Sequence, residues 1–181
     1  MKIIVLGGTG FVGRALLASL AREGHELTVL SRNPHIHLLR LLPPGTRMVA
    51  GDVYDTDLLK THFAGADAVI NLVGILNESG DNGRGFQRAH VTLTKQIIAA
   101  CQLVGVRRLL QMSSLNAGRG DSFYLKSRGE AETALKASGL EWTIFQPSVI
   151  FGPDDGFFCR FAALLKLSPF LPMAKASARF A

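Results

Sequence analysis

The sequence predicts an α/β protein built on a doubly wound parallel sheet, with helices on both faces in a three-layer αβα arrangement. Three observations predict this class. Short apolar segments alternate with helical segments along the chain. Several of the apolar segments lack the alternation of a half-exposed strand, which indicates strands buried on both faces. The first of them runs directly into a glycine-rich turn and an amphipathic helix.

The strands and helices are expected in a regular order. The strand segments are residues 2–6, 27–30, 47–50, 67–73, 106–112 and 142–145. The helical segments between them are residues 11–23, 55–63, 86–104 and 124–138. In 86–104, the clearest helix, apolar residues recur at three- and four-residue spacing: Phe86, Ala89, Leu93, Ile97, Ala100 and Val104. Right-handed crossovers through these helices would make neighbouring strands parallel.

Length and composition favour a single domain over residues 1–181. The chain has 181 residues, of which 48% are hydrophobic and 19% are charged, so it can bury a core. No apolar run reaches the roughly 18 residues that span a bilayer, and glycine follows the first apolar residues too soon for a signal peptide. A cytoplasmic location is therefore expected.

Charge and cysteine content argue against several classes of protein. The net charge is +6, but the basic residues are scattered, so a nucleic-acid partner is not expected. An anionic cofactor accounts for part of the excess. Cys101 and Cys159 lie far apart and outside any metal-ligand spacing, and are expected to be small buried side chains. The histidines show no ligand spacing either, so no metal is expected.

The strongest motif is the glycine pattern Gly7-x-x-Gly10-x-x-Gly13 between the first strand and the first helix. Glycines in this context let the backbone approach a pyrophosphate, whose charge then faces the helix N-terminus. The sequence therefore predicts a Rossmann fold that binds a dinucleotide, with a tight structural turn as the alternative. The contacts expected from this turn are Gly7, Thr9, Gly10, Phe11, Val12 and Gly13.

The end of the second strand indicates which dinucleotide is bound. An acidic residue there would bind the ribose 2′-hydroxyl of NAD, whereas this sequence has Ser31 and Arg32. A guanidinium suits a 2′-phosphate, so NADP(H) is favoured over NAD(H). The alternative is a solvated arginine at the end of a strand.

Together with further segments, the glycine motif resembles the short-chain dehydrogenase/reductase superfamily, in its atypical and extended branch of NAD(P)-dependent epimerase-like proteins. The similar segments are "GDVYD" (51–55), "NLVG" (71–74), "MSSLNA" (112–117) and "QPSVIFGP" (146–153), in which Gln146 replaces the usual arginine. The resemblance implies further cofactor contacts at Asp52, Val53, Leu72, Val73, Gly74, Ser113, Pro147 and Val149.

The resemblance also implies a catalytic site of tyrosine, serine and lysine. The matching positions are Tyr124, Ser114 with Ser113 as the second choice, and Arg128 where the family has lysine. Tyr124 and Arg128 fall about one helical turn apart on one face, whereas Lys126 points away.

The arginine leaves the reaction open. A fixed positive charge near Tyr124 favours the phenolate, but a guanidinium cannot release a proton. An intact catalytic tyrosine and a retained site with little or no turnover are both compatible with the sequence. A structural pairing with Glu132, one turn later on the helix, is the alternative role for Arg128.

Within the superfamily, the chain is most similar to the nucleotide-binding accessory subunit of respiratory complex I and its bacterial homologues. The similarity lies in "NLVGIL", "GLEWTIFQPSVIFGPDDGF" and "RFAALLKLSPFLPM". It implies a structural NADPH and association with a respiratory complex or other protein partner, peripherally at the inner face of the membrane. Members of this branch usually continue into a substrate-binding region, so the resemblance also implies that residues 147–181 begin such a region, truncated here. Two alternatives are an active epimerase, dehydratase or reductase acting on a sugar nucleotide or small carbonyl substrate, and an NmrA-like redox-sensing regulator.

Two features fall outside these motifs. Residues 157–167 carry apolar side chains at helical spacing, which indicates core packing or a substrate lid, with a membrane-surface or partner contact as the alternative. His90 lies on the cofactor side of the helix at 86–104, and it is expected to be a structural histidine.

Overall fold

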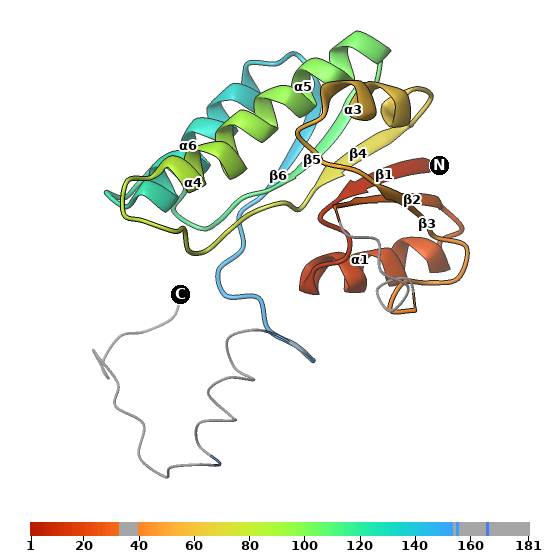
Figure 1. Cartoon of the computed structure of the whole chain (residues 1–181), viewed down its shortest axis with the longest axis horizontal. Helices are drawn as coiled ribbons and strands as arrows, with labels where there is room; N and C mark the ends of the chain where they lie inside the picture. The colour runs from red at the N-terminus through yellow and green to blue at the C-terminus, as the bar shows by residue number, and fades with distance from the viewer. Residues whose placement is uncertain (33–39, 154, 156–165, 167–181) are drawn as a thin grey trace. The chain divides into compact units, whose positions relative to one another are not determined.

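The computed structural model describes residues 1–32, 40–153, 155 and 166. The chain forms two compact units, Met1–Gln146 and Pro147–Ala181. All the strands and helices given below belong to the first unit (Figure 1). The residues 157–165 and 167 of the apolar segment, together with Cys159, lie outside the described part.

The sheet is parallel and has the strand order β3-β2-β1-β4-β5-β6. Its strands are β1 (Lys2–Leu6), β2 (Glu26–Ser31), β3 (Arg47–Ala50), β4 (Ala68–Asn71), β5 (Arg108–Met112) and β6 (Glu141–Phe145). The order reverses between β1 and β4, so this is the doubly wound α/β sheet that the sequence predicts. The crevice for a ligand is therefore expected at the carboxyl ends of these two strands.

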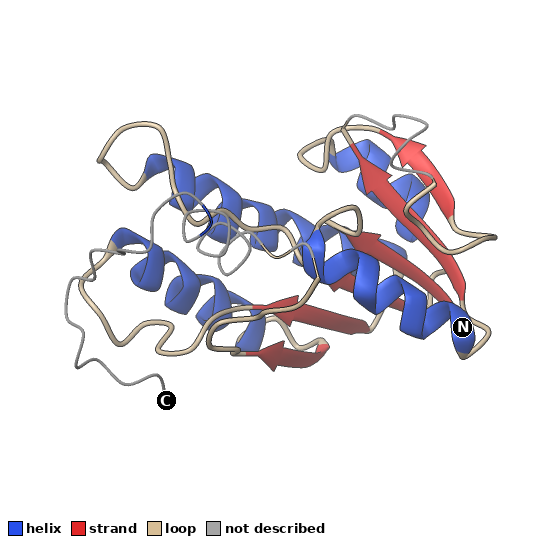
Figure 2. Ribbon diagram, turned by 90° about the horizontal axis from the view of Figure 1, so that it is seen from below, coloured by secondary structure: helices blue, strands red, loops and turns tan. Residues whose placement is uncertain are grey.

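Helices cover both faces of the sheet, as the three-layer prediction requires (Figures 1 and 2). The helical segments are α1 (Phe11–Arg22), α3 (Thr56–Phe63), α4 (Arg84–Phe86), the π-helix η1 (Gln87–Thr92), α5 (Leu93–Val104) and α6 (Phe123–Lys136). Alternate residues of β1 face opposite layers. Ile3 and Val5 pack in the cluster that includes Leu17 of α1, whereas Ile4 and Leu6 pack in the cluster with residues of α3, α5 and α6.

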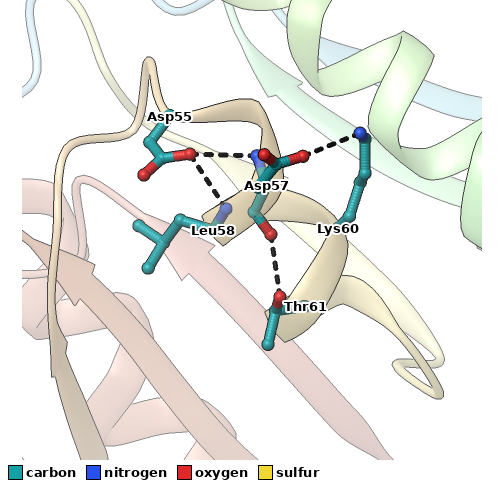
Figure 3. Close-up of polar contacts among 5 residues, drawn as sticks. All are labelled: Asp55, Asp57, Leu58, Lys60 and Thr61. Atoms are coloured by element: carbon teal, nitrogen blue, oxygen red, sulfur yellow. Dashed lines mark hydrogen bonds and ion pairs between the residues drawn. The ribbon is translucent and has the colours of Figure 1, made fainter.

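Side-chain caps fix where the helices begin. Asp55 was expected to be helical, but it is the N-cap of α3, where its Oδ1 accepts hydrogen bonds from the amides of Asp57 and Leu58 at 3.0 and 3.1 Å (Figure 3). Lys60 pairs with Asp57 at 2.9 Å, and the Thr61 hydroxyl donates to the Asp57 carbonyl at 2.8 Å (Figure 3). Ser122 caps α6 in the same way, by accepting from the Leu125 amide.

The expected helix at 86–104 differs from the prediction in one respect. Its apolar stripe is buried as predicted from Phe86 to Ala100, but residues 87–92 form a π-helix instead of continuing the α-helix. The wider turn buries the consecutive residues Ala89, His90 and Val91. A period of 3.6 residues, on which the prediction rests, does not anticipate such a segment.

Candidate functional site

A cleft of about 460 Å³ opens at the carboxyl ends of β1, β2 and β4. Many of the expected cofactor contacts line it: Gly7, Thr9, Gly10, Ser31, Arg32, Val53, Leu72, Val73 and Gly74. The remaining lining residues are Leu30, Tyr54, Ile75 and Ala89, which the sequence interpretation did not include. Tyr54 stands within the quoted "GDVYD", and Ala89 within the apolar stripe, so both had a signal in the sequence.

The glycine turn forms one wall of the cleft. Gly7 has a φ of 79°, in the left-handed region that favours glycine. A Cβ at Gly13 would come within 2.5 and 2.6 Å of the Gly8 and Gly7 carbonyl oxygens, so the turn and helix α1 pack too closely for a side chain. Gly10 is the N-cap of α1 and lines the cleft. Because no side chain caps α1, its first amides remain available to an anion.

The far end of the cleft is formed by residues after β2 and β3. Arg32 is exposed and lines the cleft beside Ser31. The Arg88 guanidinium lies over the Tyr54 ring, with Cζ 4.3 Å from the ring centroid, and the Tyr54 hydroxyl donates to the Arg88 carbonyl at 3.3 Å. Burial raises the pKa of Tyr54, against the opposing effect of Arg88. The Asp52 carboxylate accepts from the Tyr54 amide at 3.2 Å and does not line the cleft.

The loop 72–75 after β4 forms the opposite wall and is tied to buried polar groups. The Val73 amide donates to Asn71 Oδ1 at 3.1 Å, and Asn71 Nδ2 donates to Gln111 Oε1 at 2.9 Å. Asn71 and Gln111 are both buried, and the hydrogen bond between their side chains gives each a polar partner inside the protein.

Tyr124 lies on α6 among aromatic rings and a guanidinium. The rings of Phe86 and His90 contact the Tyr124 ring in T-shaped geometry, with centroid separations of 5.8 and 5.5 Å. Arg128 Cζ lies 5.5 Å from the same ring. Lys126 is exposed, and its Nζ lies 3.9 Å from Asp121, so the prediction that Lys126 points away from Tyr124 and Arg128 is confirmed.

Arg128 is 6% exposed, and Nη1 donates to the Met112 carbonyl at 2.9 Å. Its Nε is buried without a hydrogen-bond partner, and a Cβ at Gly74 would overlap its Nη2. Burial lowers the pKa of Arg128, while Tyr124 and Glu132 favour the cation. The guanidinium therefore lies directly beneath the loop that lines the cleft.

The two neighbouring serines have different environments. The Ser113 hydroxyl donates to Glu132 Oε1 at 2.6 Å, whereas the Ser114 hydroxyl is buried and has no hydrogen-bond partner among the described residues. Ser114, the first choice from the sequence, is not one of the residues that line the cleft. Ser113 does not line the cleft, and its hydroxyl is committed to Glu132.

Glu132 is 4% exposed and joins three elements. Besides Ser113, it accepts from Gln146 Nε2 at 2.7 Å, and it pairs with Lys136 at 3.1 Å. Burial alone would raise the pKa of Glu132, but these hydrogen bonds outweigh burial and lower it. The alternative pairing of Arg128 with Glu132 is wrong, since in the described part of the chain Glu132 makes its ion pair with Lys136 instead.

Several expected contacts lie outside the cleft. Phe11, Val12 and Gly13 belong to the first turns of α1 and do not line it. Pro147 and Val149 belong to the second unit, in which Val149 is 40% exposed. Cys101 is buried and free, and burial raises its pKa to about 12, as suits a small apolar side chain. Within the described residues, no three acidic, histidine or cysteine side chains gather at a metal site.

Comparison with known proteins identifies a matching protein family. Residues 7–156 match a family model described as NAD(P)H-binding. Similar curated proteins include the mitochondrial NADH dehydrogenase [ubiquinone] 1 alpha subcomplex subunit 9 of Arabidopsis thaliana, at 31% identity over 93% of this chain and 43% of that protein. The ceramide reductase of Caulobacter vibrioides is 30% identical over 99% of this chain and 56% of that protein.

Solved structures show the same fold. A Rossmann-fold NAD(P)-binding family protein from Shigella flexneri has a TM-score of 0.64 and 27% identity, over 85% of this chain and 70% of that one. UDP-glucuronic acid 4-epimerase from Bacillus cereus, in complex with NAD, has a TM-score of 0.74 and 18% identity, over 92% and 64% of the two chains. The chain spans about half the length of the curated relatives it matches.

Proposed function

This chain belongs to the NAD(P)H-binding family, and from that premise we propose that its cleft holds NADP(H) as a bound, structural nucleotide beside a site of Tyr124, Ser114 and Arg128. The glycine turn is built for this ligand. Gly10 leaves room for a pyrophosphate at the N-terminus of α1, because the nearest atom to a Cβ there, beyond its chain neighbours, would be the Gly7 carbonyl oxygen at 3.3 Å.

The observation that favours NADP(H) over NAD(H) is Arg32. It lines the cleft at the end of β2, where an acidic side chain would bind a 2′-hydroxyl, and its exposed guanidinium can donate to a 2′-phosphate.

We expect Arg32→Ala to weaken NADPH binding by about 10- to 100-fold and NADH binding much less, since only NADPH has the 2′-phosphate. Calorimetry with both nucleotides measures this. Arg107→Ala is the matched control. Arg107 is an exposed arginine just before β5 that pairs with Glu141 of β6, and it does not line the cleft. Equal losses for the two nucleotides in Arg32→Ala would remove the case for NADP(H).

The structural role rests on how Arg128 is held. A side chain in this position that serves catalysis must reach the nicotinamide ribose, but Nη1 of Arg128 is bound to the Met112 carbonyl and Nη2 lies against Gly74. Two relatives of this chain are named as subunits of mitochondrial NADH dehydrogenase. We therefore propose association with a respiratory complex, peripherally at the cytoplasmic, inner face of its membrane. No helix within the described residues is long and apolar enough to cross a bilayer.

A reductase is the second candidate function, and the free hydroxyl of Ser114 favours it. In that reaction Tyr124 would donate its proton to a substrate carbonyl oxygen, and Ser114 would donate a hydrogen bond to the same oxygen. Arg128 would favour the phenolate that remains. When bound, the dinucleotide supplies the hydride. Relatives named ceramide reductase and 2-alkyl-3-oxoalkanoate reductase favour a carbonyl substrate with long alkyl chains over a sugar nucleotide.

Hydride transfer separates the two candidates. For a structural nucleotide, we expect NADPH to co-purify with the full-length protein and to reduce no ketone in a panel of carbonyl compounds. NADP⁺ should oxidise no sugar nucleotide, and the protein should sediment with respiratory membranes. Turnover that is lost in Tyr124→Phe, with NADPH affinity retained, would instead establish the reductase. A protein partner that binds only one redox state of the nucleotide would indicate the regulator.

A further inference from the structure

Three consecutive residues of the loop 72–75 connect to helix α6. The Val73 amide is bound by Asn71, whose partner Gln111 donates to the Met112 carbonyl that also accepts from Arg128. Gly74 lies against the Arg128 guanidinium. The third connection, from Ile75, runs through His90.

His90 contacts both the loop and α6. The Ile75 amide donates to His90 Nε2 at 3.3 Å, and His90 Nδ1 lies 2.8 Å from the Ser127 hydroxyl. That hydroxyl donates in turn to the Tyr124 carbonyl at 2.9 Å. Since the side chain of His90 is 1% exposed, these contacts take up its hydrogen-bonding capacity.

The contacts are compatible with one tautomer of His90. Nε2 accepts from a backbone amide, so the proton of a neutral ring must be on Nδ1. The Ser127 hydroxyl already donates to Tyr124 and can accept this proton. Hydrogen bonds therefore run in one direction, from Ile75 to His90, from His90 to Ser127, and from Ser127 to Tyr124.

The ring is held neutral by its surroundings. Burial and, to a smaller extent, the nearby Arg128 cation lower the pKa of His90 to about 3. Protonation would also place a hydrogen on Nε2, against the Ile75 amide. His90 thus combines a fixed orientation, through its two hydrogen bonds, with a direct ring contact to Tyr124.

We propose that His90 is a positioning residue that holds the loop 72–75 and Tyr124 in a fixed relation, through Ser127, so that a nucleotide seated against the loop meets the tyrosine in one geometry. The proposal rests on NADP(H) binding in the cleft. The chain of contacts predicts that loss of His90 loosens the loop and affects the nicotinamide end of the ligand more than the adenine end.

The test compares four variants of the full chain: His90→Leu, His90→Gln, Ser127→Ala and the double variant His90→Leu/Ser127→Ala. We expect His90→Leu to weaken NADPH binding by about fivefold to tenfold. The probe 2′,5′-ADP, which lacks the nicotinamide, should bind with unchanged affinity. His90→Gln, with one acceptor and one donor on its amide, should recover part of the loss. The double variant should lose no more than His90→Leu, because both substitutions break one chain of hydrogen bonds.

Hydrogen exchange and a control for stability distinguish the positioning role of His90 from a general contribution to stability. In His90→Leu and in the milder Ser127→Ala, exchange should accelerate at the amides of residues 73–75 and stay unchanged in the strands. Ile97→Val, a buried change in the adjacent α5, should lower the thermal unfolding temperature without affecting NADPH affinity. The proposal is overturned if His90→Leu binds NADPH like the wild type, or if 2′,5′-ADP and NADPH lose affinity equally. Failure of the wild type to bind NADPH would instead refute the proposed function.

Discussion

Replacing Gly10 by valine is expected to abolish binding of both NADPH and NADH while leaving the fold intact, a loss of more than about 100-fold in affinity. Gly10 has a φ of −74°, which any residue adopts, and a Cβ there would meet only the Gly7 carbonyl at 3.3 Å. The valine side chain would therefore fill the cleft, where the pyrophosphate is expected, while the Gly7 carbonyl would have to shift by only a few tenths of an ångström. Calorimetry gives the affinity, and circular dichroism with thermal unfolding confirms the fold.

A control for this substitution lies one turn further along the same helix. Ala15 of α1 is exposed and does not line the cleft, so Ala15→Val introduces a valine into the same helix without blocking the ligand. Gly13 is unsuitable for the test, because a Cβ there would overlap the backbone of Gly7 and Gly8 and would disturb the turn as well as the ligand site. Unchanged affinity in Gly10→Val would show that the glycine motif is a structural turn.

Removing Arg128 should produce the largest loss of stability among the site residues, about 2 to 4 kcal/mol in the free energy of unfolding. Arg128→Ala deletes a buried guanidinium, leaves the Met112 carbonyl without that donor, and opens space beneath Gly74. NADPH affinity should fall with it, because the loop 72–75 lies on this side chain. Urea unfolding, at an unchanged slope, measures the stability.

Lys126→Ala is the matched control on the same helix. Lys126 is exposed, and a distance of 3.9 Å from Asp121 makes its ion pair weak, so we expect a change within about 0.5 kcal/mol and normal NADPH binding. Equal effects of the two substitutions would contradict the assignment of Arg128 to the buried face of α6. Arg128→Lys keeps the charge but not the hydrogen-bond geometry of a guanidinium. Its free energy of unfolding should lie between those of the wild type and Arg128→Ala.

The fold could be predicted because its signals are local. Apolar segments bounded by glycine located all the strands of the first unit within a few residues, and the glycine turn located the cleft. The predicted strand at 67–73 ends early, at Asn71, because the Asn71 side chain binds the Val73 amide and turns the chain into the loop. The side chain that ends the strand is visible in the sequence, but its partner Gln111 is 40 residues away.

The polar contacts of the site could not be predicted because they join distant segments. Arg128 and Glu132 stand at the spacing of a helical ion pair, yet Glu132 is satisfied by Ser113 and Gln146 from two neighbouring strand ends. Gln146, which replaces the arginine usual in the family, thereby donates to a buried carboxylate. His90 was expected to be a structural histidine, and its burial and hydrogen bonds agree with that, but its partners lie 15 and 37 residues away along the chain and could not be identified from the sequence.

The π-helix at 87–92 also constrains sequence alignments of this chain and the positions at which insertions and deletions can be made. It contacts Tyr54, which lines the cleft, through Arg88, and it contacts Tyr124 through His90, so both contacts depend on its residue count. Deleting one residue would let the segment relax to an α-helix, so that Ala89, His90 and Val91 could no longer all be buried. Homologues one residue shorter should therefore carry their alignment gap within this segment. We expect insertions and deletions to be tolerated among the exposed residues 79–81. Between Arg84 and Leu93 they would displace Arg88 and His90 from their contacts with the two tyrosines.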